Sequence, residues 1–233
     1  MFSALEQLLL PAECLSCRGL LPWTQSDALV CPACRTRWRA LRPPWCERCG
    51  QPEPHFGPCR LCPEWPPALR RARSAVWLDS EAREAVHALK YRGLPRVAAD
   101  LAARMVRVLP RPIPPATLIP VPLGPRRLRE RGYNQSEHLA AALGRHWRLP
   151  VRPDPLVRRL DTATQTALTP TARLANVAGA FAGRNVPRSP VILVDDVFTT
   201  GATLAEAARA LAAAGAREIA AVTFGRAVIP DFT

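Results

Sequence analysis

The second part of the chain, from about residue 74, carries apolar residues at the spacings of regular secondary structure. Runs with helical spacing predict four amphipathic helices, and short continuous apolar runs predict three buried strands. Strands that alternate with helices are typical of a parallel sheet with helices on both faces, so we expect a doubly wound α/β fold. The predicted helices span 80–93, 96–109, 134–147 and 203–216, and the predicted strands span 117–123, 191–195 and 218–225.

The ends of two helices carry recognisable stop and start signals. Ser80 is a good N-cap residue for the first helix, and Gly93 follows its last apolar position. Gly215 ends the last helix in the same way. Glycine is favoured just after a helix because it adopts the left-handed backbone conformation without a steric penalty.

The first part of the chain lacks this periodicity and is punctuated by proline and cysteine. Prolines cluster near 42–67 and again near 110–122, where they indicate irregular or connecting segments. The length of 233 residues fits one ordinary domain plus a small one. We therefore expect a small N-terminal domain over 1–70 and an α/β domain over 71–233.

All eight cysteines lie in four C-x-x-C pairs within the small domain. A disulfide framework would need an oxidising compartment, and a redox C-x-x-C usually occurs once, at the start of a helix. Two C-x-x-C turns together complete a tetrahedral thiolate site, so we predict two structural zinc ions in a double zinc ribbon, which would stabilise a segment with little core. Sequential pairing is the simplest arrangement, and the spacing is also compatible with interleaved pairing. The predicted ligands are Cys14, Cys17, Cys31, Cys34, Cys46, Cys49, Cys59 and Cys62.

The formal net charge of +13 comes almost entirely from arginine. Such a balance favours polyanions: nucleic acid, nucleotide phosphates or an anionic membrane surface. Tryptophans among arginines in the small domain form a candidate platform for single-stranded bases, although such tryptophans more often form the core of a small domain. The candidate nucleic-acid residues are Arg35, Arg37, Trp38, Arg39, Arg42, Trp45, Arg126, Arg127 and Arg129.

No segment has the length and apolar character of a membrane span, and the start of the chain is a poor signal peptide because Glu6 interrupts its apolar stretch. We expect a cytoplasmic protein, with the inner membrane face as a further location for so basic a chain.

The segment VILVDDVFTTGAT, residues 191–203, places two carboxylates after an apolar strand and a hydroxyl-rich loop before a helix. Such a loop offers backbone amides, hydroxyls and the positive helix end to a phosphate. The two acids suit a vicinal diol or an associated Mg²⁺. The layout predicts a ribose 5-phosphate site, whereas an ordinary strand-to-helix turn is the alternative. Its predicted binding residues are Asp195, Asp196, Val197, Phe198, Thr199, Thr200, Gly201, Ala202 and Thr203.

The same thirteen residues resemble the signature with which type I phosphoribosyltransferases bind phosphoribosyl pyrophosphate (PRPP). Three further stretches resemble the competence protein F (ComF) family: HALKYRG at 87–93, PVPLGPRRLRERGYNQSEHLA at 120–140 and TQTALTPTARLANVAGAF at 164–181. The resemblance covers nearly the whole chain. It implies an N-terminal cysteine-rich zinc domain joined to a phosphoribosyltransferase domain of the doubly wound type.

The resemblance also implies roles for residues outside the signature. Val121, Pro122 and Leu123 would form the loop that meets pyrophosphate, and the arginines that follow it, Arg131 included, suit pyrophosphate through paired donors. Lys90, the single lysine, would supply a compact ammonium, although its identity could also arise by chance. The stretch 158–173 resembles a mobile loop that closes over substrate, or is a plain surface loop. Its expected polar contacts, with the residues that follow, are Gln165, Thr166, Arg173 and Asn176.

Three functions fit these features. The family resemblance favours a protein that handles single-stranded DNA in natural transformation, together with other DNA-uptake proteins, and that has a PRPP-type site. An active phosphoribosyltransferase is the second, with Lys90, Arg131, Asp195 and Asp196 as catalytic residues and Mg²⁺–PRPP as donor substrate. A regulatory module that senses PRPP without turnover is the third.

Overall fold

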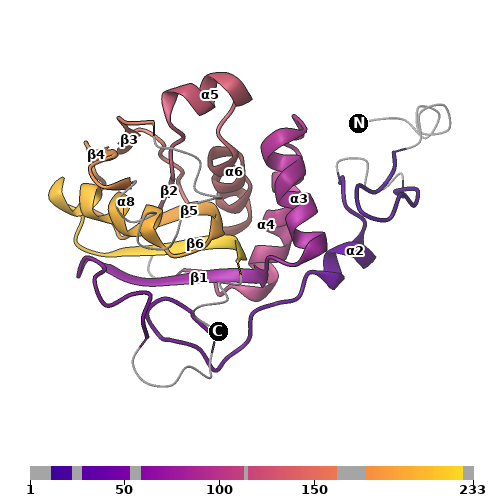
Figure 1. Ribbon diagram of the computed structural model, residues 1–233, viewed down its shortest axis with the longest axis horizontal. Helices are drawn as coiled ribbons and strands as arrows, with labels where there is room; N and C mark the ends of the chain where they lie inside the picture. Colours follow the sequence, from indigo (N-terminus) through magenta and orange to yellow (C-terminus); the bar gives the residue numbers. More distant parts are fainter. Residues whose placement is uncertain (1–11, 23–27, 53–58, 113–114, 162–176, 228–233) are drawn as a thin grey trace.

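The computed structural model describes residues 12–22, 28–52, 59–112, 115–161 and 177–227. Its centre is a four-stranded sheet in which every neighbouring pair is parallel (Figure 1). The strand order is β1-β6-β5-β2, so the two central strands lie late in the sequence. The strands are β1 (Leu69–Trp77), β2 (Thr117–Pro120), β5 (Val191–Phe198) and β6 (Ile219–Arg226).

Helices cover both faces of the sheet, which confirms the predicted doubly wound α/β fold. On one face, three helices bury Val194, Phe224 and neighbouring strand residues, whereas α8 covers the alternate residues such as Leu193 and Ala221. This alternation follows from the two-residue repeat of a strand. The first face carries α3 (Ser80–Tyr91), α4 (Val97–Val108) and α6 (Gln135–Trp147), and the second carries α8 (Ala202–Ala213).

Smaller elements flank this sandwich. α5 (Pro125–Arg131) stands above the sheet between β2 and α6 (Figure 1). β3 (Leu156–Arg158) and β4 (Phe181–Gly183) form an antiparallel pair that packs against α8. Gly183 allows this approach, because a Cβ there would lie 2.5 Å from the carbonyl oxygen of Ala210.

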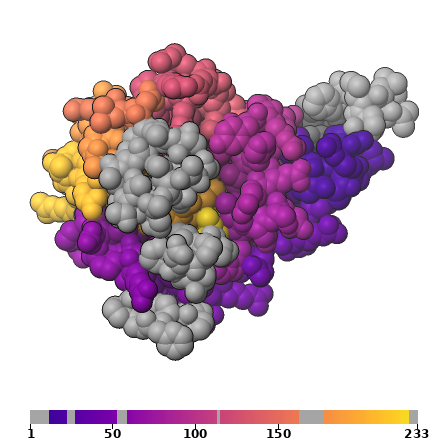
Figure 2. All heavy atoms as spheres, viewed as in Figure 1, coloured from indigo at the N-terminus to yellow at the C-terminus, as the bar shows by residue number. Residues whose placement is uncertain are grey.

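The two cysteine-containing segments lie on opposite faces of the sheet. The first, described over 12–22 and 28–41 and including α2 (Pro32–Arg37), packs against α3 and α4, and Figure 2 shows it in indigo beside the magenta helices. Asp100 of α4 anchors it by accepting hydrogen bonds from the amides of Leu29 (2.9 Å) and Val30 (3.2 Å). The second, described over 45–52 and 59–66, contributes Cys49, Cys62 and Trp65 to the core on the α8 side.

Several boundaries differ from the sequence prediction. β5 continues to Phe198, so the twin acids lie inside the strand rather than after it. The N-cap of α3 is Asp79 instead of Ser80, because the Asp79 carboxylate accepts the amide of Ala82 at 3.3 Å. β1 was missed because three arginines interrupt its apolar pattern, and α5 because none of its residues is buried.

Among the residues that the structure describes, no helix is both long enough and apolar enough to cross a bilayer.

Candidate functional site

A cavity of about 890 Å³ opens at the carboxyl edge of the sheet. Parallel α/β sheets bind ligands at this edge, where the loops after the strands converge. The end of β5, the loop after β2, α3 and α5 all contribute to its wall. It gathers eleven of the residues singled out in the sequence: Lys90, Val121, Pro122, Leu123, Arg127, Arg131, Asp195, Asp196, Val197, Thr199 and Thr203.

The two adjacent aspartates meet different partners in this cavity. Asp195 accepts a hydrogen bond from the Ser136 hydroxyl and another from the amide of Asp196, both at 2.9 Å. Asp196 is 3% exposed, and its Oδ2 lies 2.7 Å from the ammonium of Lys90. Lys90 thus places a positive charge beside the two neighbouring carboxyl groups.

Asp195 carries the strongest electrostatic perturbation of the cavity's carboxyl groups. Burial and the neighbouring charge of Asp196 raise its pKa to about 7, although Lys90 and the two hydrogen bonds oppose the rise. Asp195 therefore changes its charge near neutral pH.

The loop after β5 presents only some of its side chains to the cavity. Thr199 and Thr203 line it, and Gly201 begins α8 with φ of +81°. Phe198, Thr200 and Ala202 face the protein interior instead, with the Thr200 hydroxyl accepting the Ala202 amide at 3.4 Å. Hence, of the residues 197–203 that we predicted to bind the ligand, Val197, Thr199 and Thr203 line the cavity, whereas the side chains of Phe198, Thr200 and Ala202 are buried.

Asn134 holds the loop after β2 in place. Its side-chain amide donates to the carbonyl of Val121 at 3.1 Å, while its oxygen caps α6 by accepting the amide of Ser136. Arg131 hydrogen bonds to Gln135 and lies over the ring of Tyr91, 5.2 Å from the ring centroid. The guanidinium is thereby oriented at the wall of the cavity.

Sequence reasoning missed several residues of the cavity wall. Arg158 lines it from β3, yet it fell within the stretch assigned to a mobile loop. Burial, and to a lesser degree the charge of Arg127, lowers its pKa, whereas Asp195 and Asp161 raise it. His87 and Tyr91, which pack ring to ring at 5.0 Å, also line the cavity from α3. Their spacing with Lys90 on one helix face was the available signal.

The expected loop contacts Gln165, Thr166, Arg173 and Asn176 lie outside the described residues.

The eight cysteines form two clusters of four, and the structure brings sequential pairs together. Within each cluster all four sulfur atoms lie within 4.8 Å of one another. In a tetrahedral zinc site with Zn–S bonds of about 2.3 Å, neighbouring sulfurs are about 3.8 Å apart. The Cys17–Cys31 sulfurs are 3.8 Å apart and the Cys46–Cys62 sulfurs 3.7 Å apart, so both clusters fit structural zinc.

The candidate nucleic-acid residues divide by exposure. Trp38 is fully buried against Phe224, so its ring cannot stack on a base, and that assignment was wrong. Arg35 pairs with buried Asp100 at 3.4 Å, and Trp45 lies half-buried under Arg73.

The remaining candidates lie at the surface or in the cavity. Arg37, Arg39, Arg42 and Arg129 are exposed, and Arg39 lies over Trp77, 5.6 Å from the ring centroid. Arg126 is also exposed but pairs with Glu130 at 2.7 Å. Among the described residues of the small domain, Arg37, Arg39 and Arg42 are therefore the exposed members of the predicted platform, and we call them the exposed arginines of 37–42.

Comparison with known proteins identifies both parts of the chain. Residues 5–63 match the model of the double zinc ribbon domain, and residues 157–227 match the phosphoribosyl transferase domain. Competence protein ComFC of Bacillus subtilis is 31% identical over 79% of this chain and 78% of its own length. DNA utilization protein YhgH of Salmonella typhi is 34% identical over 91% and 96%, and competence protein F of Haemophilus influenzae is 29% identical over 89% and 93%.

Proposed function

The chain belongs to the ComF family of competence and DNA utilization proteins, and on that premise we propose that it handles single-stranded DNA during DNA uptake in natural transformation while binding PRPP, or a related ribose phosphate, in its α/β part. The observation that carries the proposal is the cavity into which four separate segments place cations, twin acids and a phosphate-type loop. A cytoplasmic location, in part at the inner membrane face, suits reduced cysteines and a positive chain.

Different residues of the cavity suit different chemical groups of the proposed ligand. Thr199 and Thr203, with the amides at the start of α8, would hold the 5-phosphate against the positive helix end. Asp195 and Asp196 would accept hydrogen bonds from the two ribose hydroxyls or hold an associated Mg²⁺. Lys90 places its ammonium 2.7 Å from Oδ2 of Asp196 and would orient that carboxyl group for this role.

The opposite wall would receive pyrophosphate. The backbone of 121–123, steadied by Asn134, offers a narrow approach to it. Arg127, Arg131 and Arg158 supply guanidinium groups, whose planar donor arrangement matches phosphate oxygens. Lys90 is paired with Asp196, and the remaining positive side chains outnumber the acidic ones at this wall. This excess of positive charge favours a multiply charged anion.

Turnover of PRPP is the second candidate function, and the clustering of these guanidinium groups beside the ribose site favours it. As the bond from C1 to pyrophosphate breaks, negative charge grows on the leaving group and positive charge on the ribose. Arg131 and its neighbours would stabilise the former, and the twin acids the latter, so catalysis would rest on positioning and charge. A PRPP sensor would bind in the same way and release nothing.

One titration tests the shared site. Mg²⁺–PRPP should raise the melting temperature of the protein, because a ligand that binds only the folded state stabilises it. The variant Asp195→Asn/Asp196→Asn keeps the shape of both side chains and should lose most of the effect, at roughly 1.5–3 kcal/mol per charged hydrogen bond. Ser189→Ala, at an exposed residue before β5, is the control. A wild-type protein that gains no stability from PRPP would refute the site.

Release of pyrophosphate distinguishes the two roles of that site. Incubation of Mg²⁺–PRPP with a panel of nucleobases should yield pyrophosphate if the protein is a transferase. Binding without release, at protein concentrations that saturate the ligand, identifies a sensor.

DNA binding is tested on the exposed arginines of 37–42. The variant Arg37→Gln/Arg39→Gln/Arg42→Gln should bind single-stranded DNA more weakly and with a shallower salt dependence. Each arginine that binds a phosphate contributes roughly 0.7 to the log–log slope against salt. Arg145→Gln/Arg188→Gln/Arg217→Gln removes the same charge from other exposed positions and should change affinity less. Equal reductions in both variants would contradict a defined platform.

A further inference from the structure

Trp65, three residues after the last cysteine, lies directly beneath the loop that follows β5. A Cβ placed on Gly201 would lie 2.7 Å from Cζ2 of Trp65 and 2.9 Å from Cζ of Phe198. The rings of Trp65 and Phe198 are 6.0 Å apart. Trp65 is 5% exposed, and it is therefore part of the floor on which the loop rests.

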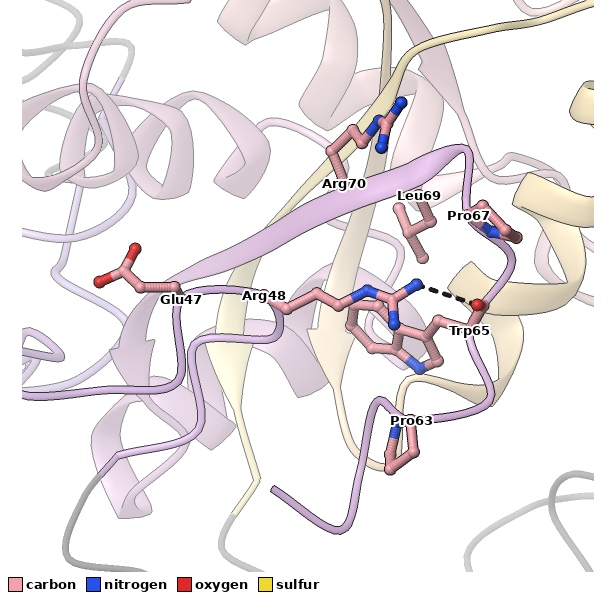
Figure 3. A pocket seen from close by; sticks show the side chains of 7 residues that line it. All are labelled: Glu47, Arg48, Pro63, Trp65, Pro67, Leu69 and Arg70. Carbon is pink, nitrogen blue, oxygen red and sulfur yellow. Dashed lines mark hydrogen bonds between the residues drawn. The ribbon is translucent and has the colours of Figure 1, made fainter. Parts of the chain in front are cut away.

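Arg48, between two cysteine ligands, fixes Trp65 from the other side. Its guanidinium donates to the carbonyl of Trp65 at 2.9 Å and to that of Cys62 at 2.9 Å, and it lies over the indole ring at the edge of an open cavity of about 510 Å³ (Figure 3). The position of Trp65 is thus tied to the backbone of the second cysteine cluster, Cys46, Cys49, Cys59 and Cys62.

Arg226, at the end of β6, makes a second connection. It is 2% exposed and donates to the carbonyl of Cys49 at 2.9 Å and to the side chain of Gln51 at 2.8 Å. Its guanidinium carbon also lies 4.1 Å from the ring centroid of Phe198. A buried cation requires compensation, and a thiolate cluster that carries net negative charge when metal-bound supplies it nearby.

The first cluster, Cys14, Cys17, Cys31 and Cys34, makes no such connection among the described residues. It packs with α3 and α4 on the other face of the sheet. Its tryptophan, Trp38, contacts Phe224, which lies inside β6 rather than beneath the loop. The two clusters are alike in ligands and differ in what they support.

We propose that the second cysteine cluster, when metal is bound, holds the phosphate loop 199–203 in its binding conformation, with Trp65 and Arg226 as positioning residues. Metal fixes Cys49 and Cys62, these fix Arg226 and Trp65, and the two side chains fix Phe198 and Gly201. Metal at the second cluster and ribose phosphate at the loop then favour the same arrangement. Their binding is positively coupled, and the coupling is reciprocal. The ligand half of this inference rests on the proposed function, whereas the ordering of the loop does not.

Hydrogen exchange of the metal-loaded protein tests the ordering of the loop without any ligand. Cys59→Ser should speed exchange of the amides in 199–205, and the matched variant Cys17→Ser should leave that segment as protected as in the wild type. Zinc content, measured with a colorimetric chelator, verifies that each variant has lost one of the two metals. Equal exchange in the two variants, or unchanged exchange in Cys59→Ser, would overturn the proposal.

Conservative substitutions test the same proposal if a cysteine variant fails to fold. Trp65→Phe should weaken Mg²⁺–PRPP binding by about tenfold, within the usual range of coupling, and speed exchange over 199–205. Trp38→Phe, a matched change on the other face, should lower stability while leaving both readouts near wild type. Identical effects of the two substitutions on the loop contradict the inference. If the wild type binds no PRPP, the proposed function fails, whereas the exchange data still test whether the second cysteine cluster orders the loop.

Discussion

Neighbouring residues at the end of β5 acquire different roles from different surroundings. Asp195 faces Ser136 and Asp196 faces Lys90, so two identical side chains form a coupled pair with one compensating cation. Phe198 and Thr199 diverge in the same way, one into the core and the other into the cavity. The contacts of each residue therefore determine its electrostatic surroundings and whether its side chain reaches the cavity.

The raised pKa of Asp195, about 7 instead of the ordinary value near 3.8, predicts a pH dependence. Below pH 7 the Asp195 carboxyl group holds a proton, and above pH 7 it is ionised, so affinity for Mg²⁺–PRPP should rise as pH increases through 7. Because the folded state binds the proton more tightly than the unfolded state, the stability of the ligand-free protein should fall over the window from about pH 4 to 7. Asp195→Asn should flatten both profiles, measured by calorimetry and thermal melts. A wild-type affinity that is flat through pH 7 contradicts the prediction.

Gly201 and Gly132 share a left-handed backbone but differ in surroundings. Their φ values are +81° and +80°, yet a Cβ would contact Trp65 and Phe198 at Gly201 and nothing within 4 Å at Gly132. Gly132→Ala should cost about 1–2 kcal/mol from backbone strain alone. Gly201→Ala should cost more, because the steric conflict adds to the strain. Chemical denaturation measures both, and equal costs would show that Trp65 does not restrict this position.

At the scale of elements, the helices were predicted well because each buries one face with regular spacing. The elements that the sequence did not predict depend on contacts with distant parts of the chain. β1 carries two exposed arginines and one half-buried arginine among its buried positions, and its place in the sheet depends on pairing with β6, about 150 residues later. α5 buries none of its residues, and Asp161, from beyond β3, accepts the amide of Arg126 near its start.

The start of α3 offers a paired test of capping. Asp79→Ala removes the carboxylate that accepts the Ala82 amide and should cost about 0.5–2 kcal/mol of stability. Ser80→Ala, one residue later, removes an exposed hydroxyl that donates to the Glu81 carboxylate and should change stability by less than about 0.5 kcal/mol. Urea denaturation resolves the two. A larger destabilisation at Ser80 would restore the assignment that the sequence suggested.

At the scale of the whole molecule, the cysteine-rich part and the α/β part share their cores, although a boundary in the sequence separates them. The boundary that we propose, between residues 70 and 71, falls inside β1, and each cysteine cluster contributes to the core on one face of the sheet. The two cysteine-containing segments thereby cover apolar surface of the α/β part. The metals would contribute to the stability of the complete chain through these contacts.

This arrangement predicts one cooperative unfolding transition. Far-ultraviolet circular dichroism, which reports the helices, and tryptophan fluorescence, which is dominated by the cysteine-rich half, should give the same midpoint. A strong chelator should lower that midpoint for both probes together. Two separated transitions would show that the halves fold independently.

Local spacing alone determined the four C-x-x-C turns, the alternation of helices and strands, and the hydroxyl-rich loop that follows the twin acids. Each of these depends on residues close together in the chain, where geometry follows directly from sequence separation. Four C-x-x-C pairs specify metal ligands, but they do not specify which pairs meet.

Only the tertiary structure decided the contacts between distant segments. It paired the cysteines sequentially, buried Trp38, and placed Trp65 beneath the loop at Gly201. It also brought Arg158 to the cavity wall. Burial and contact depend on how the sheet is ordered and which face each segment covers, and neither property is encoded in the spacing of nearby residues.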